Sequence, residues 1–327
     1  MAEIAVACEQ TLPEGLLENA APVILRGYVS EWPVVQQCHN KPDAVMAYLA
    51  GFYNHKPVHV MRTDASNNGR LFYNETLTGF NFSRSKDSLD QVFNELKQSE
   101  QSERDTLYVG STAIDHILPG FRQDNDLPAL HSKALVSIWL GNQSRIAAHY
   151  DAPDNIACVV AGRRRFTLFP PEQIKNLYIG PLDFTPAGQP ASLVDFHNPD
   201  LKRFPLFEEA LQHAVVADLG PGDAIYIPSM WWHHVEGLAD FNVLINYWWR
   251  QVDNFIGAPA DALMHAILSI RELPPQQRAY WREVFEHYVF SPEEQAHIPP
   301  ANRGILNPLD NNTARYLRGL LLNKLNR

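Results

Sequence analysis

A histidine and an aspartate two residues apart, His149 and Asp151, could together bind a metal ion. On a β-strand, residues i and i+2 point to the same face, so the imidazole and the carboxylate would project together. A further histidine from a neighbouring strand would complete two nitrogen ligands and one oxygen ligand on one side of a metal. This set is the facial triad that holds non-haem Fe(II) and leaves other coordination positions open.

The chain offers two adjacent candidates for the third ligand, His233 and His234, within the run Trp231-Trp-His-His-Val-Glu236. Neighbouring residues on a strand face opposite sides of the sheet, so only one of the two can point to the same side as His149 and Asp151. Strand alternation alone does not choose between them.

Three consecutive arginines, Arg163-Arg164-Arg165, could provide a cation for a carboxylate co-substrate such as 2-oxoglutarate. The outer two fit a solvated edge, whereas Arg164 shares its strand face with apolar Phe166. Burying this arginine without an anion would be costly, and a dicarboxylate would offset that cost through a bidentate contact. Asn155 and Asn246 offer amide groups on neighbouring strands, although buried asparagines can equally tie strand ends together.

The elements around these residues indicate a mainly-β core with flanking helices. Between residues 134 and 249, short runs of branched and aromatic residues alternate with turn residues, which is typical of a double-stranded β-helix, or jelly-roll. Residues 156–161 and 163–170 are predicted to form a hairpin through Gly162. We expect an N-terminal α/β segment packed on the core (1–105), the jelly-roll itself (106–250) and a C-terminal helical region (251–327).

The composition is that of an ordinary globular protein, with 327 residues of which 45% are hydrophobic and 20% charged. The net charge of −10 argues against nucleic acid as a partner. The three cysteines form no disulfide framework, and the N-terminus lacks the pattern of a signal peptide. No apolar run approaches the roughly 20 residues needed to cross a bilayer. We therefore expect a cytoplasmic protein without a membrane partner.

Four blocks of the sequence resemble the cupin-like JmjC family of Fe(II)- and 2-oxoglutarate-dependent oxygenases, in particular the asparaginyl hydroxylases of the hypoxia-inducible factor. These blocks are His149-Tyr-Asp151, Gly162-x-Arg-Arg-Phe-x-Leu-Phe-Pro-Pro171, Gly220-Pro-Gly-Asp-x-x-Tyr-Ile-Pro228 with Trp231-Trp-His-His-Val-Glu236, and Asn246-Tyr-Trp248. The similarity is dense over about residues 106–250. It implies a cupin/JmjC jelly-roll and the cofactors Fe(II), 2-oxoglutarate and O2.

The resemblance also implies a role for each matching residue. Fe(II) would be bound by His149, Asp151 and His234, 2-oxoglutarate would be held by Tyr108, Asn155, Arg164 and Asn246, and Trp248 would lie near the substrate. Two positions depart from the family pattern. Arg164 replaces a lysine, which keeps the charge but changes its reach and geometry. Ile146 stands where the relative has a hydroxyl residue for the same carboxylate, so another group must compensate.

The predicted function is oxygenation, with hydroxylation of a side chain in a protein or peptide as the expected outcome. Demethylation, or an oxygenase acting on RNA or a small molecule, is an alternative within the same chemistry. A cupin-type binding module without oxygenase activity is the alternative from another class. By resemblance, the C-terminal helices predict a homodimer. The loops that would meet a substrate, residues 66–80 and 171–200, do not reveal its identity.

Overall fold

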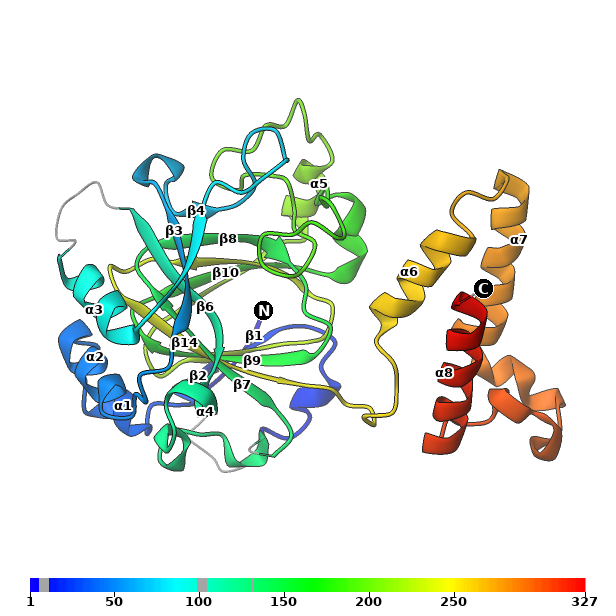
Figure 1. Cartoon of the computed structure of the whole chain (residues 1–327), viewed down its shortest axis with the longest axis horizontal. Helices are drawn as coiled ribbons and strands as arrows, with labels where there is room; N and C mark the ends of the chain where they lie inside the picture. The colour runs from blue at the N-terminus through cyan, green and yellow to red at the C-terminus, as the bar shows by residue number, and fades with distance from the viewer. Residues whose placement is uncertain (6–11, 99–104, 131, 327) are drawn as a thin grey trace. The chain divides into compact units, whose positions relative to one another are not determined.

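Figure 1 presents the structure, a computed structural model that describes residues 1–5, 12–98, 105–130 and 132–326. The chain divides into two compact units, Met1–Arg250 and Gln251–Arg327. The first unit contains the β-sheets and every candidate site residue, and the second is helical.

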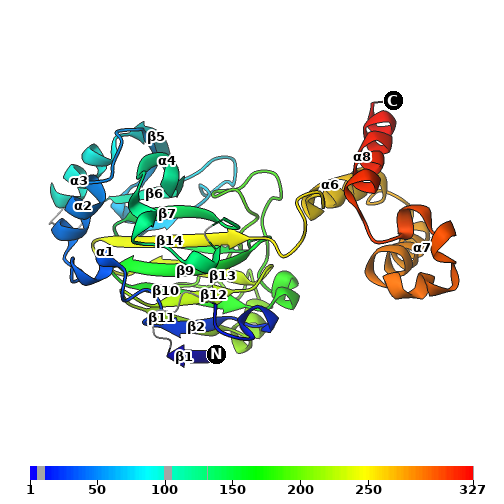
Figure 2. The same ribbon diagram turned by 90° about the horizontal axis from the view of Figure 1, so that it is seen from below.

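The strands of the described residues form one sheet of nine strands and one of five (Figures 1 and 2). In spatial order, the larger sheet consists of β1 (Ala2–Ala5), β2 (Val23–Arg26), β12 (Ala224–Ile227), β9 (Asp154–Ala161), β14 (Asn242–Trp249), β7 (Leu135–Gly141), β6 (Thr106–Ala113), β3 (Val58–Thr63) and β5 (Ser83–Asp87). The smaller sheet consists of β11 (Val215–Leu219), β10 (Arg164–Phe169), β13 (Trp232–Gly237), β8 (Ser144–His149) and β4 (Arg70–Leu71).

Strands β7 to β14 build a jelly-roll, because the chain repeatedly crosses between the two sheets. The quartet β12-β9-β14-β7 lies in the larger sheet and the quartet β11-β10-β13-β8 in the smaller one. The predicted mainly-β jelly-roll is therefore confirmed. The predicted hairpin at Gly162 is wrong, since β9 pairs with β12 and β14 while β10 pairs with β11 and β13. Gly162, at φ 76°, provides a tight crossing from one sheet to the other.

Alternation along the strands creates two apolar layers. One lies between the sheets and includes Val159, Phe166, Ile225 and Val235. The other covers the outer face of the larger sheet, where it packs against the N-terminal helices. Strand β9 is buried at every residue because both of its faces are covered. The helices of this unit are α1 (Pro33–Gln36), α2 (Pro42–Ala50), α3 (Leu89–Gln98), α4 (Ile114–Ile117) and α5 (Phe207–Gln212).

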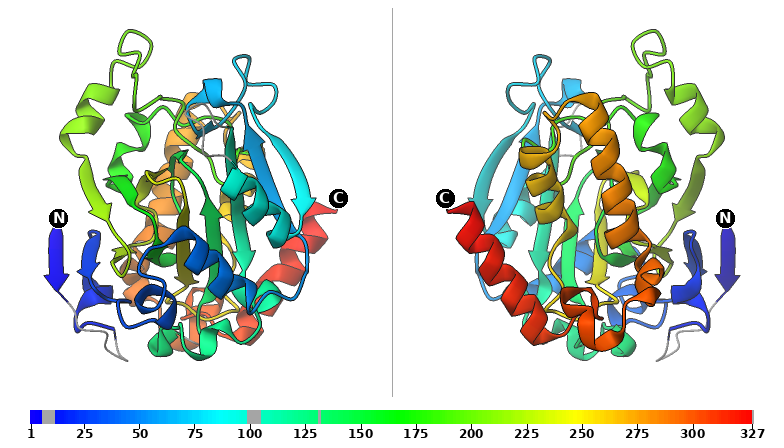
Figure 3. Two further views of the ribbon diagram at one scale, coloured as in Figure 1. Left: turned by 90° about the vertical axis from the view of Figure 1, so that its left-hand side faces the viewer. Right: turned by 90° about the vertical axis from the view of Figure 1, so that its right-hand side faces the viewer.

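The described residues of the second unit form the longer helices α6, α7 and α8 (Figure 3). Helix α6 spans Pro259–Ser269, α7 spans Pro275–Phe285 and continues as a π-helix over Glu286–Phe290, and α8 spans Asn311–Leu325. Large apolar side chains such as Leu268, Trp281 and Leu322 are exposed on them, and no residue described in α6 or α7 is buried. Across the described ranges, no helix combines the length and the hydropathy needed to cross a membrane.

Candidate metal centre and co-substrate cavity

The three side chains that could hold a metal come together where β8 and β13 pair. His149 is the last residue of β8 and lies directly opposite His233 in the register of the two strands. The centroids of their rings are 4.4 Å apart. Asp151 follows two residues beyond the strand end, and its Oδ2 is 3.6 Å from His233 Nε2. Ligand atoms of these three residues all lie within 4.8 Å of one another.

The prediction that His234 completes this set is wrong, because His234 lies on the other face of β13. Its Nε2 is 3.2 Å from Glu236 Oε1, and its ring packs against Phe196. His233 instead shares the inner face with Val235, which contributes to the apolar layer between the sheets. A register shift between His233 and Val235 in the β8–β13 pairing accompanies this arrangement. Such bulges often re-aim side chains next to functional sites.

Both histidines of the inner set are held in the tautomer that suits metal binding. Nδ1–H of His149 donates to the carbonyl oxygen of Ala147 at 2.9 Å, and Nδ1–H of His233 donates to that of Trp231 at 3.0 Å. Each Nε2 therefore keeps a free lone pair. Burial lowers the pKa of His233 to about 4, and the neighbouring His149 contributes to this shift. His233 is thus neutral at physiological pH, as metal ligation requires.

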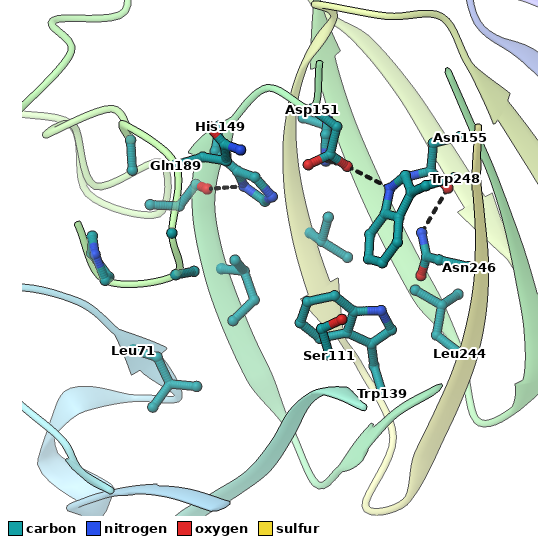
Figure 4. Close-up of a pocket in the computed structure, with 18 of the residues that line it drawn as sticks. Leu71, Ser111, Trp139, His149, Asp151, Asn155, Gln189, Leu244, Asn246 and Trp248 are labelled. Carbon is teal, nitrogen blue, oxygen red and sulfur yellow. Dashed lines mark hydrogen bonds and ion pairs between the residues drawn. The ribbon is translucent and has the colours of Figure 1, made fainter. Parts of the chain in front are cut away.

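Asp151 is oriented by contacts from two other parts of the chain. Trp248 Nε1 donates to Asp151 Oδ2 at 2.9 Å, as Figure 4 shows. The backbone N–H of Met230 donates to the carbonyl oxygen of Asp151 at 2.9 Å. Met230 adopts a left-handed conformation with φ 69°, which is unusual for a residue with a long side chain. The resemblance placed Trp248 near the substrate but gave no indication of its contact with the carboxylate.

A cavity of about 330 Å³ begins at these three residues and continues between the sheets. It brings together all of the residues predicted to contact the co-substrate or substrate, namely Tyr108, Asn155, Arg164, Asn246 and Trp248. Figure 4 shows His149, Asp151, Asn246 and Trp248 around a common space with Trp139 and Ser111. Most of the remaining lining is apolar, so the cavity offers a few polar groups among mainly apolar side chains.

Arg164 is the buried cation of this cavity. It is only 1% exposed, and its Nε and Nη1 atoms have no hydrogen-bond partner among the described residues. Burial lowers the pKa of Arg164, and the adjacent Tyr108 opposes that change. Burial raises the pKa of Tyr108, which is therefore a neutral phenol. Arg165 points outward and pairs with Asp218 at 2.8 Å, in agreement with the alternation expected for the three arginines.

Two further polar groups lack a partner at the same cavity. Asn246 Nδ2 donates to Asn155 Oδ1 at 2.7 Å, while Asn246 Oδ1 has no partner among the described residues. Within the same ranges, Trp139 Nε1 is also buried without a partner. Ile146 lines the cavity and offers no polar atom. Our sequence analysis missed Trp139, although its position between outward-packing Ile138 and Leu140 marks it as inward-facing.

Comparison with known proteins places this geometry in a family. The family model described as a cupin-like domain matches residues 9–255. The chain belongs to the cupin-like domain family. The match covers the whole jelly-roll and most of the N-terminal segment, so the resemblance of the four sequence blocks is confirmed.

Several relatives within the cupin-like family are named for different roles. The chain is 35% identical over 138 residues to lysine-specific demethylase JMJ31 of Arabidopsis thaliana, which covers 41% of the chain and 25% of that relative. It is 33% identical over 149 residues to human HSPB1-associated protein 1, covering 44% and 30%. It is 34% identical over 104 residues to tRNA wybutosine-synthesizing protein 5 of Gallus gallus, covering 32% and 30%. The matched parts thus span less than a third of each of these relatives.

Proposed function

We propose that this cupin-like protein is an Fe(II)- and 2-oxoglutarate-dependent oxygenase. The observation that carries the proposal is the buried guanidinium of Arg164, two of whose nitrogen atoms have no partner among the described residues, in a cavity that also contains His149, Asp151 and His233. When bound, Fe(II) with 2-oxoglutarate and O2 supplies oxidation of an unactivated C–H bond, coupled to decarboxylation of the co-substrate to succinate. The donor set fits this metal, since two imidazoles and one carboxylate are the ligands of the non-haem Fe(II) facial triad.

One group of residues would bind the metal, and another would bind the co-substrate. His149, Asp151 and His233 would hold the metal, and Trp248 would keep the carboxylate of Asp151 oriented. Arg164 would form charge-assisted hydrogen bonds to the distal carboxylate of 2-oxoglutarate. The apolar lining would exclude water from the site, which strengthens the electrostatic interactions within it.

Trp139 is our candidate for the group that compensates for the missing hydroxyl at Ile146. Its Nε1–H is buried, lines the same cavity as Arg164 and has no partner among the described residues. An indole N–H is a donor only, so it suits an incoming carboxylate oxygen. Tyr108 would add a phenolic donor from β6. Asn155 on β9 and Asn246 on β14 would offer amide groups from neighbouring strands of the same sheet.

Hydroxylation of a side chain in a protein or peptide is the reaction that we propose. A relative named as a lysine-specific demethylase supports a protein substrate, and the net charge of −10 makes a polyanionic substrate unfavourable. The relative named for wybutosine synthesis in tRNA makes an RNA substrate the alternative within the same chemistry. We further propose a cytoplasmic homodimer. The exposed apolar side chains of α6 to α8, Trp281 among them, support self-association, and a monomer in light scattering would refute it.

Succinate release tests the proposed activity. Purified protein incubated with Fe(II), ascorbate, O2 and 2-oxoglutarate should release succinate, and His149→Ala should abolish the release. Release that needs neither iron nor His149 would refute the oxygenase. A metal-bound module without activity would instead show no change in melting temperature when 2-oxoglutarate is added with Mn(II). Mass spectrometry for products heavier by one oxygen, with wild type compared with Asp151→Ala in cell extract, would identify the substrate.

A further inference from the structure

A second group of potential metal ligands lies on the outer face of β13. His234 and Glu236 project from that face, and His197 reaches them from the segment before α5. One ligand atom from each of these residues lies within 4.8 Å of the other two. Adjacent residues of one strand, His233 and His234, therefore belong to two separate clusters on opposite sides of the sheet.

Both histidines of the outer cluster direct a ring nitrogen at the same carboxylate oxygen. His234 Nε2 is 3.2 Å from Glu236 Oε1, and His197 Nε2 contacts the same atom. Zinc is held at about 2.0–2.2 Å by imidazole nitrogen and carboxylate oxygen, which sets tetrahedral ligands roughly 3.3–3.5 Å apart. The spacing of His234 Nε2 and Glu236 Oε1 is close to that of such a site.

The charge of the cluster also favours a cation. Glu236 and His234 are each only 5% exposed. Within the described part of the chain, the ion-pair contacts of Glu236 are those with the two histidines. The nearby guanidinium of Arg145 is engaged with Asp195 at 3.0 Å. A buried carboxylate such as that of Glu236 is costly unless a positive charge pairs with it.

The exposed side of the cluster provides a route for an ion. The side chain of His197 is 54% exposed and lines a polar groove together with Asp195 and Asn198. An ion bound by the three side chains would keep its fourth position open to water from this groove. Two histidines and one glutamate with a bound water form a donor set that proteins use for Zn(II).

We propose that His197, His234 and Glu236 form a second metal site, selective for a divalent ion of the zinc type and separate from the cavity of the inner set. The bound ion ties the segment around His197 to β13, the strand that also carries His233. Its effect is therefore to stabilise the folded first unit. The inference is independent of the proposed oxygenase activity.

Metal binding in a background without the inner site tests the proposal. The background is Asp151→Ala, and the comparison variants add His197→Gln or His213→Gln. His213 is a matched control, since it is an exposed histidine 3.1 Å from a carboxylate oxygen of Glu209. Zn(II) content after dialysis, visible absorption with Co(II) and the shift in melting temperature on Zn(II) addition are measured for all three proteins. Circular dichroism without metal verifies that each variant is folded.

We expect Asp151→Ala and its His213→Gln derivative to retain one Zn(II) per chain, to give a tetrahedral Co(II) spectrum and to gain melting temperature with Zn(II). The His197→Gln derivative should bind Zn(II) at least about tenfold more weakly, a loss typical of removing one ligand or its support. Equal Zn(II) affinity in all three proteins, or no binding in the Asp151→Ala background, would overturn the proposal and leave the cluster as a hydrogen-bonded group.

Discussion

Replacing Arg164 with methionine should have opposite effects on stability and on co-substrate affinity. In the ligand-free protein, the guanidinium is buried, and two of its nitrogen atoms have no partner among the described residues. Replacing even a buried ion pair with well-packed apolar groups is often stabilising, by about 1–4 kcal/mol, and Arg164 has no carboxylate partner among the described residues to lose. For a unit of this size, 1 kcal/mol corresponds to about 2–4 °C in melting temperature. We expect Arg164→Met to raise the melting temperature of the ligand-free protein by roughly 2–16 °C.

The same substitution should weaken the binding of 2-oxoglutarate. Hydrogen bonds to charged groups contribute about 1.5–3 kcal/mol each, and the guanidinium can form two of them to one carboxylate. Their loss, about 3–6 kcal/mol, raises the dissociation constant by roughly 10²–10⁴-fold. The affinity can be measured by calorimetric titration of 2-oxoglutarate into the protein with Mn(II) in place of iron, and the stability by differential scanning calorimetry without ligand.

Arg165→Met is the matched control for this experiment. Arg165 is the next residue of the same strand, but it points outward and pairs with Asp218 on the surface. Exposed ion pairs contribute little to stability, about 0–1 kcal/mol, so this variant should change neither measurement appreciably. If Arg164→Met destabilised the ligand-free protein and left the affinity for 2-oxoglutarate within threefold, Arg164 would be a structural residue and our assignment would be wrong.

Three further predictions concern the candidate metal ligands, the indole that contacts Asp151, and a tyrosine in the apolar layer on the outer face of the larger sheet. His233→Ala should abolish Fe(II)-dependent succinate release, whereas His234→Gln should retain it; the reverse result would restore His234 as the ligand. Trp248→Phe removes the indole N–H from Asp151 and should weaken Fe(II) binding about 10–100-fold in a chelator competition, and an unchanged affinity would contradict this. Burial raises the pKa of Tyr247 well above its ordinary value, so its contribution to stability is complete below about pH 10 and lost as the pH rises further. Tyr247→Phe should therefore destabilise the protein by about 1 kcal/mol in urea at pH 7 but by less at pH 11, and an equal loss at both would disprove the shift.

The sequence could predict features of the site that depend on strand alternation and composition. The inward direction of Arg164 and the outward direction of Arg165 follow from the period of two along β10. The pairing of His149 with Asp151 required only their spacing, although Asp151 proves to lie just beyond the end of β8. The jelly-roll could be predicted because many short strands alternate with turn residues over residues 134–249.

Features that depend on which strands pair could not be predicted in the same way. The choice between His233 and His234 depends on the register of β13 against β8, which contains a bulge that no local pattern reveals. The supposed hairpin at Gly162 failed for a related reason, because a glycine turn between two apolar runs serves equally well for a crossing between sheets. The contact of Trp248 with Asp151 joins residues far apart in the chain, so no local sequence pattern could predict it.

The three candidate metal ligands differ in which part of the chain orients them. His149 and His233 each donate Nδ1–H to the backbone carbonyl two residues earlier on their own strands. Because backbone atoms accept these bonds, side-chain substitutions around the site leave the tautomer of either histidine unchanged. Asp151 depends instead on the side chain of Trp248. Substitutions near the cavity should therefore impair the proposed metal centre mainly by changing the orientation of the Asp151 carboxylate. Since Trp248 also lines the cavity, a substrate that displaces its indole would alter the orientation of Asp151.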